Sequence, residues 1–232
     1  MNTQQQSLPR ILVGCPTSFY QEYCLPEYVR AVKNLTYPLY DILLVDNSED
    51  DSYFKKIQSF GLPVIKGPWF QSAKERIVAS RNLLREKAVQ QYDYFLSLEQ
   101  DVIPPKDVIE RLLAHKKEVL SGMYYTVKDK GLRPLLIVKN PVTGALSYLD
   151  SQKILEYNTL FEITLCGLGC VLISCKILTQ LSFRHVLGNK SFDDFWFCKD
   201  VLEKGFRLYA DPSVLCNHLF LKRPWKWEDL EK

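Results

Sequence analysis

The sequence predicts an α/β fold built on a mixed, mostly parallel central sheet. Short apolar runs typical of strands alternate with helical periodicities through the first half of the chain, and this alternation is typical of a parallel sheet covered by helices. In the second half, the segment Asn140-Pro-Val-Thr-Gly144 separates two apolar runs and predicts an antiparallel hairpin. No linker or internal repeat divides the chain, so we expect one domain over residues 1–232.

The first half contains a regular series of expected strands and helices. Strands are expected at residues 11–15, 42–45, 63–66, 94–98 and 119–126. Helices are expected at residues 26–34, 52–60, 73–90 and 106–115. The third helix has the clearest pattern, because one face carries Ala73, Ile77, Leu84 and Ala88. These elements would complete a Rossmann-like half, about residues 10–126, that binds a nucleotide.

The second half is expected to add antiparallel strands to the same sheet. The expected strands are 135–139 and 145–149, which form the hairpin, and then 170–174, 207–210 and 214–216. A helix is expected over residues 192–204, ended by Gly205. Residues of about 127–220 would form an acceptor-side half continuous with the first, followed by a tail at 221–232.

Composition excludes several classes of protein. Hydrophobic residues make up 47% and charged residues 25% of the 232 residues, as in an ordinary globular domain. The formal net charge of +3 is too small for a dedicated nucleic-acid binder. No apolar run approaches the roughly 20 residues of a membrane span, and the polar start of the chain does not resemble a secretory signal. We therefore expect a cytoplasmic protein.

The seven cysteines form no CxxC pair. This scatter favours reduced, buried cysteines over a disulfide framework or a zinc ribbon. An intracellular disulfide of the kind found in hyperthermophiles remains the alternative.

Two acids directly follow the buried strand expected at residues 94–98. Ligands of open α/β sheets bind at the carboxyl ends of strands, and alternate residues point the same way. Glu99 and Asp101 can therefore converge on one divalent cation, which would neutralise a bound diphosphate. In the alternative, Glu99 caps the strand end and Asp101 faces solvent.

Three further polar residues suggest a nucleotide site, each with a structural alternative. Asp46 ends a strand where a base or ribose needs a hydrogen-bond acceptor, or else it forms an Asx turn. Arg81 has five donors for a base carbonyl or a phosphate, or else it is an exposed helical arginine. His218 follows an apolar strand and can offer a neutral nitrogen to a metal such as Mn²⁺, or else it is a core histidine.

Motifs of the first half resemble those of the GT-A glycosyltransferases, particularly family 2. Gly14-Cys-Pro-Thr17 is similar to the first-strand motif, and Val45-Asp-Asn-Ser48 resembles the second-strand motif whose acid contacts the nucleotide base. Ala79-Ser-Arg-Asn82 resembles the arginine–asparagine pair on the helix before the metal strand. Glu99-Gln-Asp101 stands where the family has its DxD motif, with a glutamate in place of the first aspartate.

The resemblance continues in the same order to about residue 220. Cys166-Gly-Leu-Gly-Cys170 is similar to the glycine-containing loop beneath the acceptor site, and Ser191-Phe-Asp-Asp194 resembles the ED motif. Phe206-Arg-Leu-Tyr209 resembles the aromatic–arginine strand that follows. The segment from Asp211 to His218 resembles the one whose terminal histidine reaches the metal.

The resemblance implies a metal-dependent, hexosyltransferase-like enzyme that moves a sugar from a UDP- or GDP-linked donor to an acceptor hydroxyl, with inversion. The implied donor-binding residues are Pro16, Thr17, Asp46, Arg81, Glu99, Gln100 and Asp101. The implied ligands of Mn²⁺ or Mg²⁺ are Asp101, His218 and Glu99. Glu99 would bind the metal directly or through a bound water, or would contact the ribose instead. The implied acceptor-side loop is Gly167, Leu168 and Gly169. The acceptor would be a glycan, a lipid-linked molecule or a protein.

Asp194 is the implied general base, with Asp193 beside it. Both acids begin the helix expected at 192–204, where the positive end of the helix dipole should lower the carboxyl pKa and keep the base ionised. Adjacent helical residues point roughly 100° apart, so only one acid can face the sugar while the other caps the helix. In the alternative, both serve only as cap and dipole partner.

The end of the chain mixes apolar, aromatic and basic side chains over residues 219–227. We expect this segment to close over the donor or acceptor; peripheral contact with an anionic membrane and simple packing on the domain are the alternatives. Two other functions stay open. A sugar-1-phosphate nucleotidyltransferase ranks lower because residues 14–19 are neither glycine-rich nor basic. A non-catalytic nucleotide- or glycan-binding module leaves the polar motifs unexplained.

Overall fold

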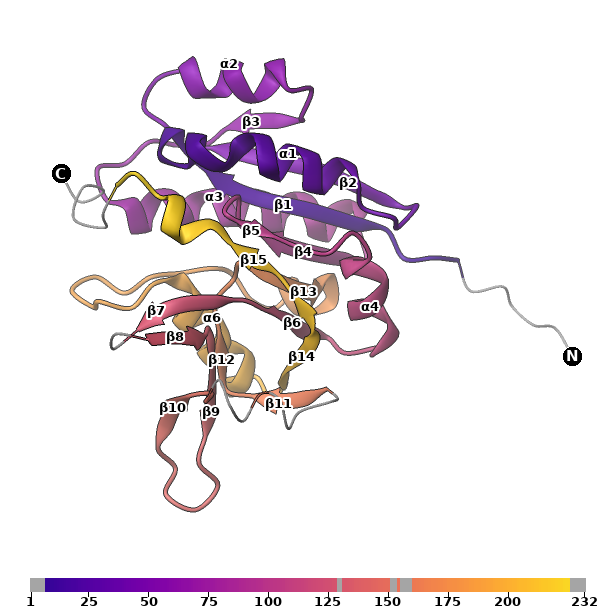
Figure 1. Cartoon of the computed structure of the whole chain (residues 1–232), viewed down its shortest axis with the longest axis vertical. Helices are drawn as coiled ribbons and strands as arrows, with labels where there is room; N and C mark the ends of the chain where they lie inside the picture. The colour runs from indigo at the N-terminus through magenta and orange to yellow at the C-terminus, as the bar shows by residue number, and fades with distance from the viewer. Residues whose placement is uncertain (1–6, 129–130, 151–153, 155–159, 226–232) are drawn as a thin grey trace, which may run out of the picture.

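The computed structural model describes residues 7–128, 131–150, 154 and 160–225. Their centre is an eight-stranded sheet (Figure 1). In order across the sheet, the strands are β11 (Phe161–Ile163), β14 (Leu208–Leu215), β6 (Val119–Met123), β13 (Cys170–Ser174), β4 (Tyr94–Leu98), β1 (Ile11–Thr17), β2 (Tyr40–Asp46) and β3 (Val64–Lys66). The strands from β4 to β3 are parallel, whereas β13 runs antiparallel to both β4 and β6. The mixed, mostly parallel sheet predicted from the sequence is confirmed.

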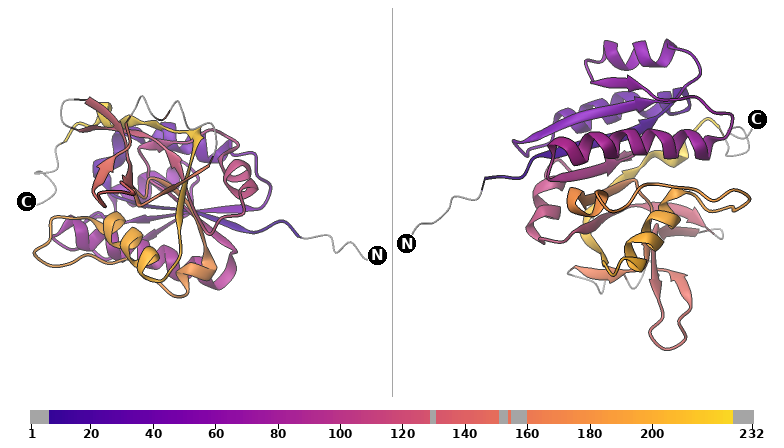
Figure 2. Two further views of the ribbon diagram at one scale, coloured as in Figure 1. Left: turned by 90° about the horizontal axis from the view of Figure 1, so that it is seen from below. Right: turned by 180° about the vertical axis from the view of Figure 1, so that it is seen from behind.

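Helices cover both faces of the sheet because its strands are apolar on both sides. In β1, Ile11 and Val13 belong to one core and Leu12 to the other. The first core includes apolar residues of α1 (Leu25–Lys33), α2 (Ser52–Ser59) and α4 (Val108–Ala114). The second includes residues of α3 (Ala73–Gln91), α5 (Cys175–Leu178) and α6 (Asp193–Glu203). Figure 2 shows α3 on the side of the sheet opposite α1.

The long helix α3 follows its sequence pattern closely. The side chain of Ser72 accepts a hydrogen bond from the backbone N–H of Glu75 and so caps the first turn. Of the predicted apolar face, Ala73, Leu84 and Ala88 are buried, while Ile77 is half-buried and lines a cavity. The N-terminal part of α3 therefore serves both the core and the cavity described below.

Three small sheets complete the second half. The predicted hairpin is present as β9 (Leu136–Lys139) and β10 (Leu146–Tyr148), joined on the other side by β12 (Leu165–Cys166), and it projects from the body in Figures 1 and 2. The second pairs β7 (Tyr125–Lys128) with β8 (Gly131–Pro134). The third pairs β5 (Val102–Ile103) with β15 (Asn217–His218). This last pairing brings the end of the chain to the residues that follow β4.

The structure corrects two strand predictions. The strand expected at 119–126 is divided into β6 and β7. The strands expected at 207–210 and 214–216 form one strand, β14, with an irregularity between Ala210 and Leu215. There Asp211 accepts a hydrogen bond from the backbone N–H of Ser213, so the chain bends at Pro212 without leaving the sheet.

Several short elements were not predicted, because two to six residues are too few to show a period. They are α5, β5, β8, β11, β12, β15 and the 3₁₀ helices η1 (Phe19–Cys24) and η3 (Leu219–Lys222). All seven cysteines are free and buried, as predicted. In the part of the chain that the structure describes, no helix is long and apolar enough to cross a membrane.

Candidate active site

A cavity lies at the carboxyl ends of β1 and β4. All the predicted donor-binding residues except Asp46 line it. Its lining is Pro16, Thr17, Ser18, Tyr20, Gln21, Asn47, Ala73, Arg76, Ile77, Arg81, Glu99, Gln100, Asp101, Arg223 and Trp225. We call it the donor cavity. Its place at the strand ends is where open α/β sheets bind their ligands.

Gln100 forms hydrogen bonds that connect the elements at the base of the donor cavity. Its Oε1 accepts hydrogen bonds from Thr17 Oγ1 at 2.5 Å and from the Tyr53 hydroxyl at 2.9 Å. Its Nε2 donates to the backbone carbonyl of Gln21 at 2.7 Å. This fully buried amide thus joins β1, α2 and η1 to the end of β4.

Asp46 is buried behind the donor cavity. Its Oδ1 accepts from the backbone N–H of Ser48 at 3.0 Å, and its Oδ2 lies 3.0 Å from Lys66 Nζ. This is the Asx-type turn that the sequence left as an alternative. The next residue, Asn47, lines the cavity instead, with its Nδ2 donating to Ser80 Oγ at 3.0 Å. Sequence analysis missed Asn47, although it belongs to the same motif.

Arg81 is the most deeply buried charged side chain of the site, with 1% of its surface exposed. Its guanidinium donates to Ser97 Oγ at 2.7 Å and to Glu99 Oε1, and its Nε forms an ion pair with Asp193 Oδ2 at 2.6 Å. Burial alone would lower the pKa of Arg81, but the charges of Asp193 and Glu99 raise it. The exposed-arginine alternative is wrong: Arg81 joins α3, the end of β4 and the start of α6.

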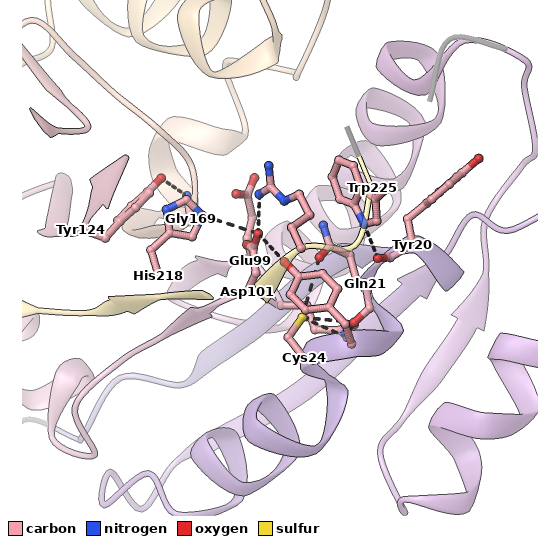
Figure 3. Close-up of polar contacts among 12 residues, drawn as sticks. Tyr20, Gln21, Cys24, Glu99, Asp101, Tyr124, Gly169, His218 and Trp225 are labelled. Carbon is pink, nitrogen blue, oxygen red and sulfur yellow. Dashed lines mark hydrogen bonds and ion pairs between the residues drawn. The ribbon is translucent and has the colours of Figure 1, made fainter. Parts of the chain in front are cut away.

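Asp101 is the acid with the most cationic surroundings. Arg223 donates to its Oδ2 at 2.6 Å, the Tyr23 hydroxyl donates to the same oxygen at 3.2 Å, and His218 Nε2 lies 3.5 Å away (Figure 3). Burial raises the pKa of Asp101, but His218 and Arg223 outweigh it and bring that pKa down to about 2. Asp101 is therefore ionised at neutral pH, and the solvent-facing alternative is wrong.

The position of His218 follows from the pairing of β15 with β5. His218 lies opposite Val102, and the backbone N–H of Leu219 donates to the carbonyl of Asp101 at 2.8 Å. His218 Nδ1 lies 2.8 Å from the carbonyl oxygen of Tyr125, which directs Nε2 toward Asp101. Burial lowers the pKa of His218, but the neighbouring Asp101 raises it by more.

The Asp101–His218 pair fits a divalent cation. A separation of 3.5 Å between Oδ2 and Nε2 lets one ion contact both atoms at about 2.1 Å. A carboxylate and an imidazole suit Mn²⁺. Glu99, predicted as a third ligand, is hydrogen-bonded to Arg81 instead, and within the described residues no cluster of three acidic, histidine or cysteine side chains could hold a metal. A diphosphate and water would have to supply the remaining ligands.

The two acids at the start of α6 diverge, as the helix geometry predicts. Asp193 is buried against Arg81, whereas Asp194 lines a second cleft. We call this the Asp194 cleft; its other lining residues are Leu135, Ile137, Tyr148, Leu165, Cys166, Gly167, Ser191, Phe192 and Phe195. Its walls are mostly apolar and aromatic.

The expected lowering of the Asp194 pKa by the helix dipole is wrong. Burial and the negative charge of Asp193 raise the pKa of Asp194 to about 7, although the backbone N–H of Phe195 donates to Oδ1 at 2.7 Å. Desolvation exceeds the dipole effect here because the carboxylate faces an apolar cleft. A carboxyl with a pKa near neutrality is well suited to accept a proton at pH 7.

The glycine loop connects the two cavities. The carbonyl of Leu168 accepts from Ser97 Oγ at 2.7 Å, and Ser97 in turn accepts from Arg81. The backbone N–H of Gly169 donates to the Tyr124 hydroxyl at 2.9 Å. A Cβ on Gly167 would lie 2.3 Å from that hydroxyl, so only glycine fits there. The predicted acceptor-side loop is thus held in contact with the floor of the donor cavity.

Arg223 and Trp225 belong to the basic and aromatic tail and line the donor cavity, although the motifs did not identify them. Closure of the tail over a donor or acceptor stays a prediction. The remaining tail residues, 226–232, lie outside the described part of the chain.

The fold is the GT-A fold, as predicted. Mannosyltransferase PcManGT from Pyrobaculum calidifontis, in complex with GDP-Man and Mn²⁺, is similar with a TM-score of 0.61 and 14% identity over 91% of this chain and 57% of that chain. TarS 1–349 from S. aureus, in complex with UDP-GlcNAc, has a TM-score of 0.56 and 16% identity over 89% of this chain and 57% of that one. A197 from STIV has a TM-score of 0.52 and 16% identity over 90% of this chain and 85% of that chain.

These identities establish a shared fold only. This chain spans 57% of the mannosyltransferase and of the TarS fragment. No protein-family model and no curated protein matches the sequence.

Proposed function

We propose that this protein is a glycosyltransferase that moves a sugar from a UDP- or GDP-linked donor to an acceptor hydroxyl, with inversion and with Mn²⁺ or Mg²⁺. The observation that carries the proposal is the pairing of Asp101, which lines the donor cavity at the strand ends, with His218. GDP-Man with Mn²⁺ and UDP-GlcNAc in proteins of the same fold support it. Action in the cytoplasm, on a glycan, lipid-linked or protein acceptor, is part of the same proposal.

In the donor half, Asp101 and His218 would hold the cation, which supplies positive charge to the leaving diphosphate when bound. Pro16, Thr17 and Asn47 line the same cavity and would contact the nucleotide. Arg81 would act as a positioning residue, because its fully buried guanidinium is already engaged by Ser97, Glu99 and Asp193.

In the acceptor half, Asp194 would take the proton of the acceptor hydroxyl as the new bond forms. The pKa of about 7 leaves a substantial ionised fraction at neutral pH. The apolar and aromatic walls of the Asp194 cleft leave the carboxylate only partly exposed to water and suit the C–H face of a sugar ring. Asp193 fixes the start of α6 through its ion pair with Arg81, and so orients Asp194.

A screen of nucleotide sugars for diphosphate release tests the proposal. Release with Mn²⁺ or Mg²⁺, lost in EDTA and in Asp101→Ala, is the expected result. If no nucleotide sugar releases diphosphate and neither UDP nor GDP binds in the presence of metal, the proposal is wrong. Product NMR with a working donor would then decide between inversion and retention.

A further inference from the structure

The chain beyond β15 carries a cation of its own into the donor cavity. We call residues 219–225 the strap. The Arg223 guanidinium lies 2.6 Å from Asp101 Oδ2 and 4.5 Å from the centre of the Trp225 ring. Trp225 Nε1 donates to the backbone carbonyl of Tyr20 on η1, which is drawn beside Trp225 in Figure 3. The strap therefore ends against η1 at the wall of the donor cavity.

Arg223 and His218 face the same oxygen of Asp101. A divalent cation bound to Asp101 Oδ2 at about 2.1 Å would lie within about 4.7 Å of the guanidinium nitrogen, which is 2.6 Å from the same oxygen. Side chains around this oxygen are almost entirely shielded, with 17% of Arg223 and 3% of Asp101 exposed. Because like charges repel strongly where water is excluded, one carboxylate oxygen cannot hold both cations.

We propose that Arg223 and a divalent cation exchange at Asp101. The guanidinium holds the carboxylate in the metal-free protein, and metal binding expels Arg223 and loosens the strap over the donor cavity. This inference rests on the proposed function, because it requires Asp101 to be a metal ligand. Residues 220–225 can leave without unfolding the sheet, since their other described polar contacts are with Tyr20 and Tyr23 on η1 and with Glu27 on α1, the last an exposed pair with Lys222 at 3.0 Å.

Titration of the protein with Mn²⁺, followed by electron paramagnetic resonance of free Mn²⁺, tests the exchange. Arg223→Gln removes the competing charge, so its Kd for Mn²⁺ should fall about tenfold or more. Arg223→Lys keeps a cation and should stay closer to the wild type. Lys222→Gln is the matched control on the same strap, and its Kd should equal that of the wild type.

Hydrogen exchange on the wild-type protein gives a second readout that needs no variant. Mn²⁺ should accelerate exchange of the backbone amides of residues 219–225. Unchanged or slower exchange there, or equal Mn²⁺ affinity for the wild type and Arg223→Gln, would overturn the inference.

Asp101→Asn separates this inference from the proposed function. If Asp101→Asn loses Mn²⁺ binding while the wild type and Arg223→Gln bind Mn²⁺ equally well, the metal site is supported and the exchange of Arg223 with the metal is refuted. Unchanged Mn²⁺ binding in Asp101→Asn refutes the metal site itself. If Arg223→Gln fails to fold, the Mn²⁺ affinity of Arg223→Lys and the hydrogen-exchange measurement on the wild type still test the inference.

Discussion

Asp194 should destabilise the folded protein at neutral and alkaline pH, and Asp194→Asn should relieve this. The folded protein raises the pKa of Asp194 from 3.8 to about 7, because burial and Asp193 disfavour its ionised form. A shift of about three units corresponds to roughly 4 kcal/mol at most. Asp194 is only partly buried, so solvent screening reduces the expected gain of the variant to about 1–3 kcal/mol.

The sign of this effect fixes its pH dependence. Below about pH 4 the carboxyl is neutral in both the folded and the unfolded chain, so the wild type and Asp194→Asn should differ little from this cause. Between about pH 4 and 7 the unfolded chain ionises first, and the wild type loses stability relative to the variant. Above pH 7 the difference should be constant.

Urea unfolding at pH 4, 6 and 8 measures this difference in the free energy of unfolding. Asp193→Asn is the matched control, and it should destabilise because it leaves the buried Arg81 without its Asp193 partner. In the same variants, transfer should fall on the order of 10²-fold or more in Asp194→Asn, with nucleotide binding kept. Two results would contradict this reasoning: Asp194→Asn is no more stable than the wild type at pH 8, or its gain in the free energy of unfolding is the same at pH 4 as at pH 8. In either case the carboxyl is not desolvated, and the physical argument for Asp194 as a general base with a pKa near 7 fails.

Three further changes test the rest of the site. Arg81→Met leaves Asp193 buried without its cation, and urea unfolding should show a loss of about 3–5 kcal/mol; a loss below about 1 kcal/mol would mean that the site relaxes around the missing charge. Asp101→Ala should abolish the metal-dependent part of nucleotide binding in titration calorimetry with UDP or GDP, and equal affinity of both proteins in the presence of Mn²⁺ would contradict that. Gly167→Ala places a methyl group 2.3 Å from the Tyr124 hydroxyl and should lower thermal stability by about 1–3 kcal/mol; an unchanged melting curve would show that the loop can move.

Local sequence patterns predicted the parts of the fold that depend on local physics. The strand before Glu99 and the helix carrying Arg81 were located within a residue or two, because burial and period are visible in a short window. Asp101 was chosen from its place at a strand end, and the resemblance pointed to Asp194 at a helix start. The structure confirms these places.

What the sequence did not predict depends on contacts between distant residues. Arg81 meets Asp193 across 112 positions of the chain, and Arg223 meets Asp101 across 122. Neither pair leaves a signal in any local window. The pKa of Asp194 was predicted in the wrong direction for a similar reason: the helix start is local, but the apolar cleft is built from β9, β10 and β12.

The middle residue of the Glu99-Gln-Asp101 motif has a consequence for how such motifs are recognised. A variable letter normally separates the two acids, yet here Gln100 is buried and hydrogen-bonded to Thr17, Tyr53 and Gln21. Glu99 to Val102 form a turn closed by a 3.0 Å hydrogen bond from the backbone N–H of Val102 to the carbonyl of Glu99, and the hydrogen bonds of Gln100 fix this turn with both acids on the cavity lining. The orientation of Glu99 and Asp101 therefore depends on the neutral residue between them. A sequence pattern that specifies only the two acids leaves out the residue that orients them.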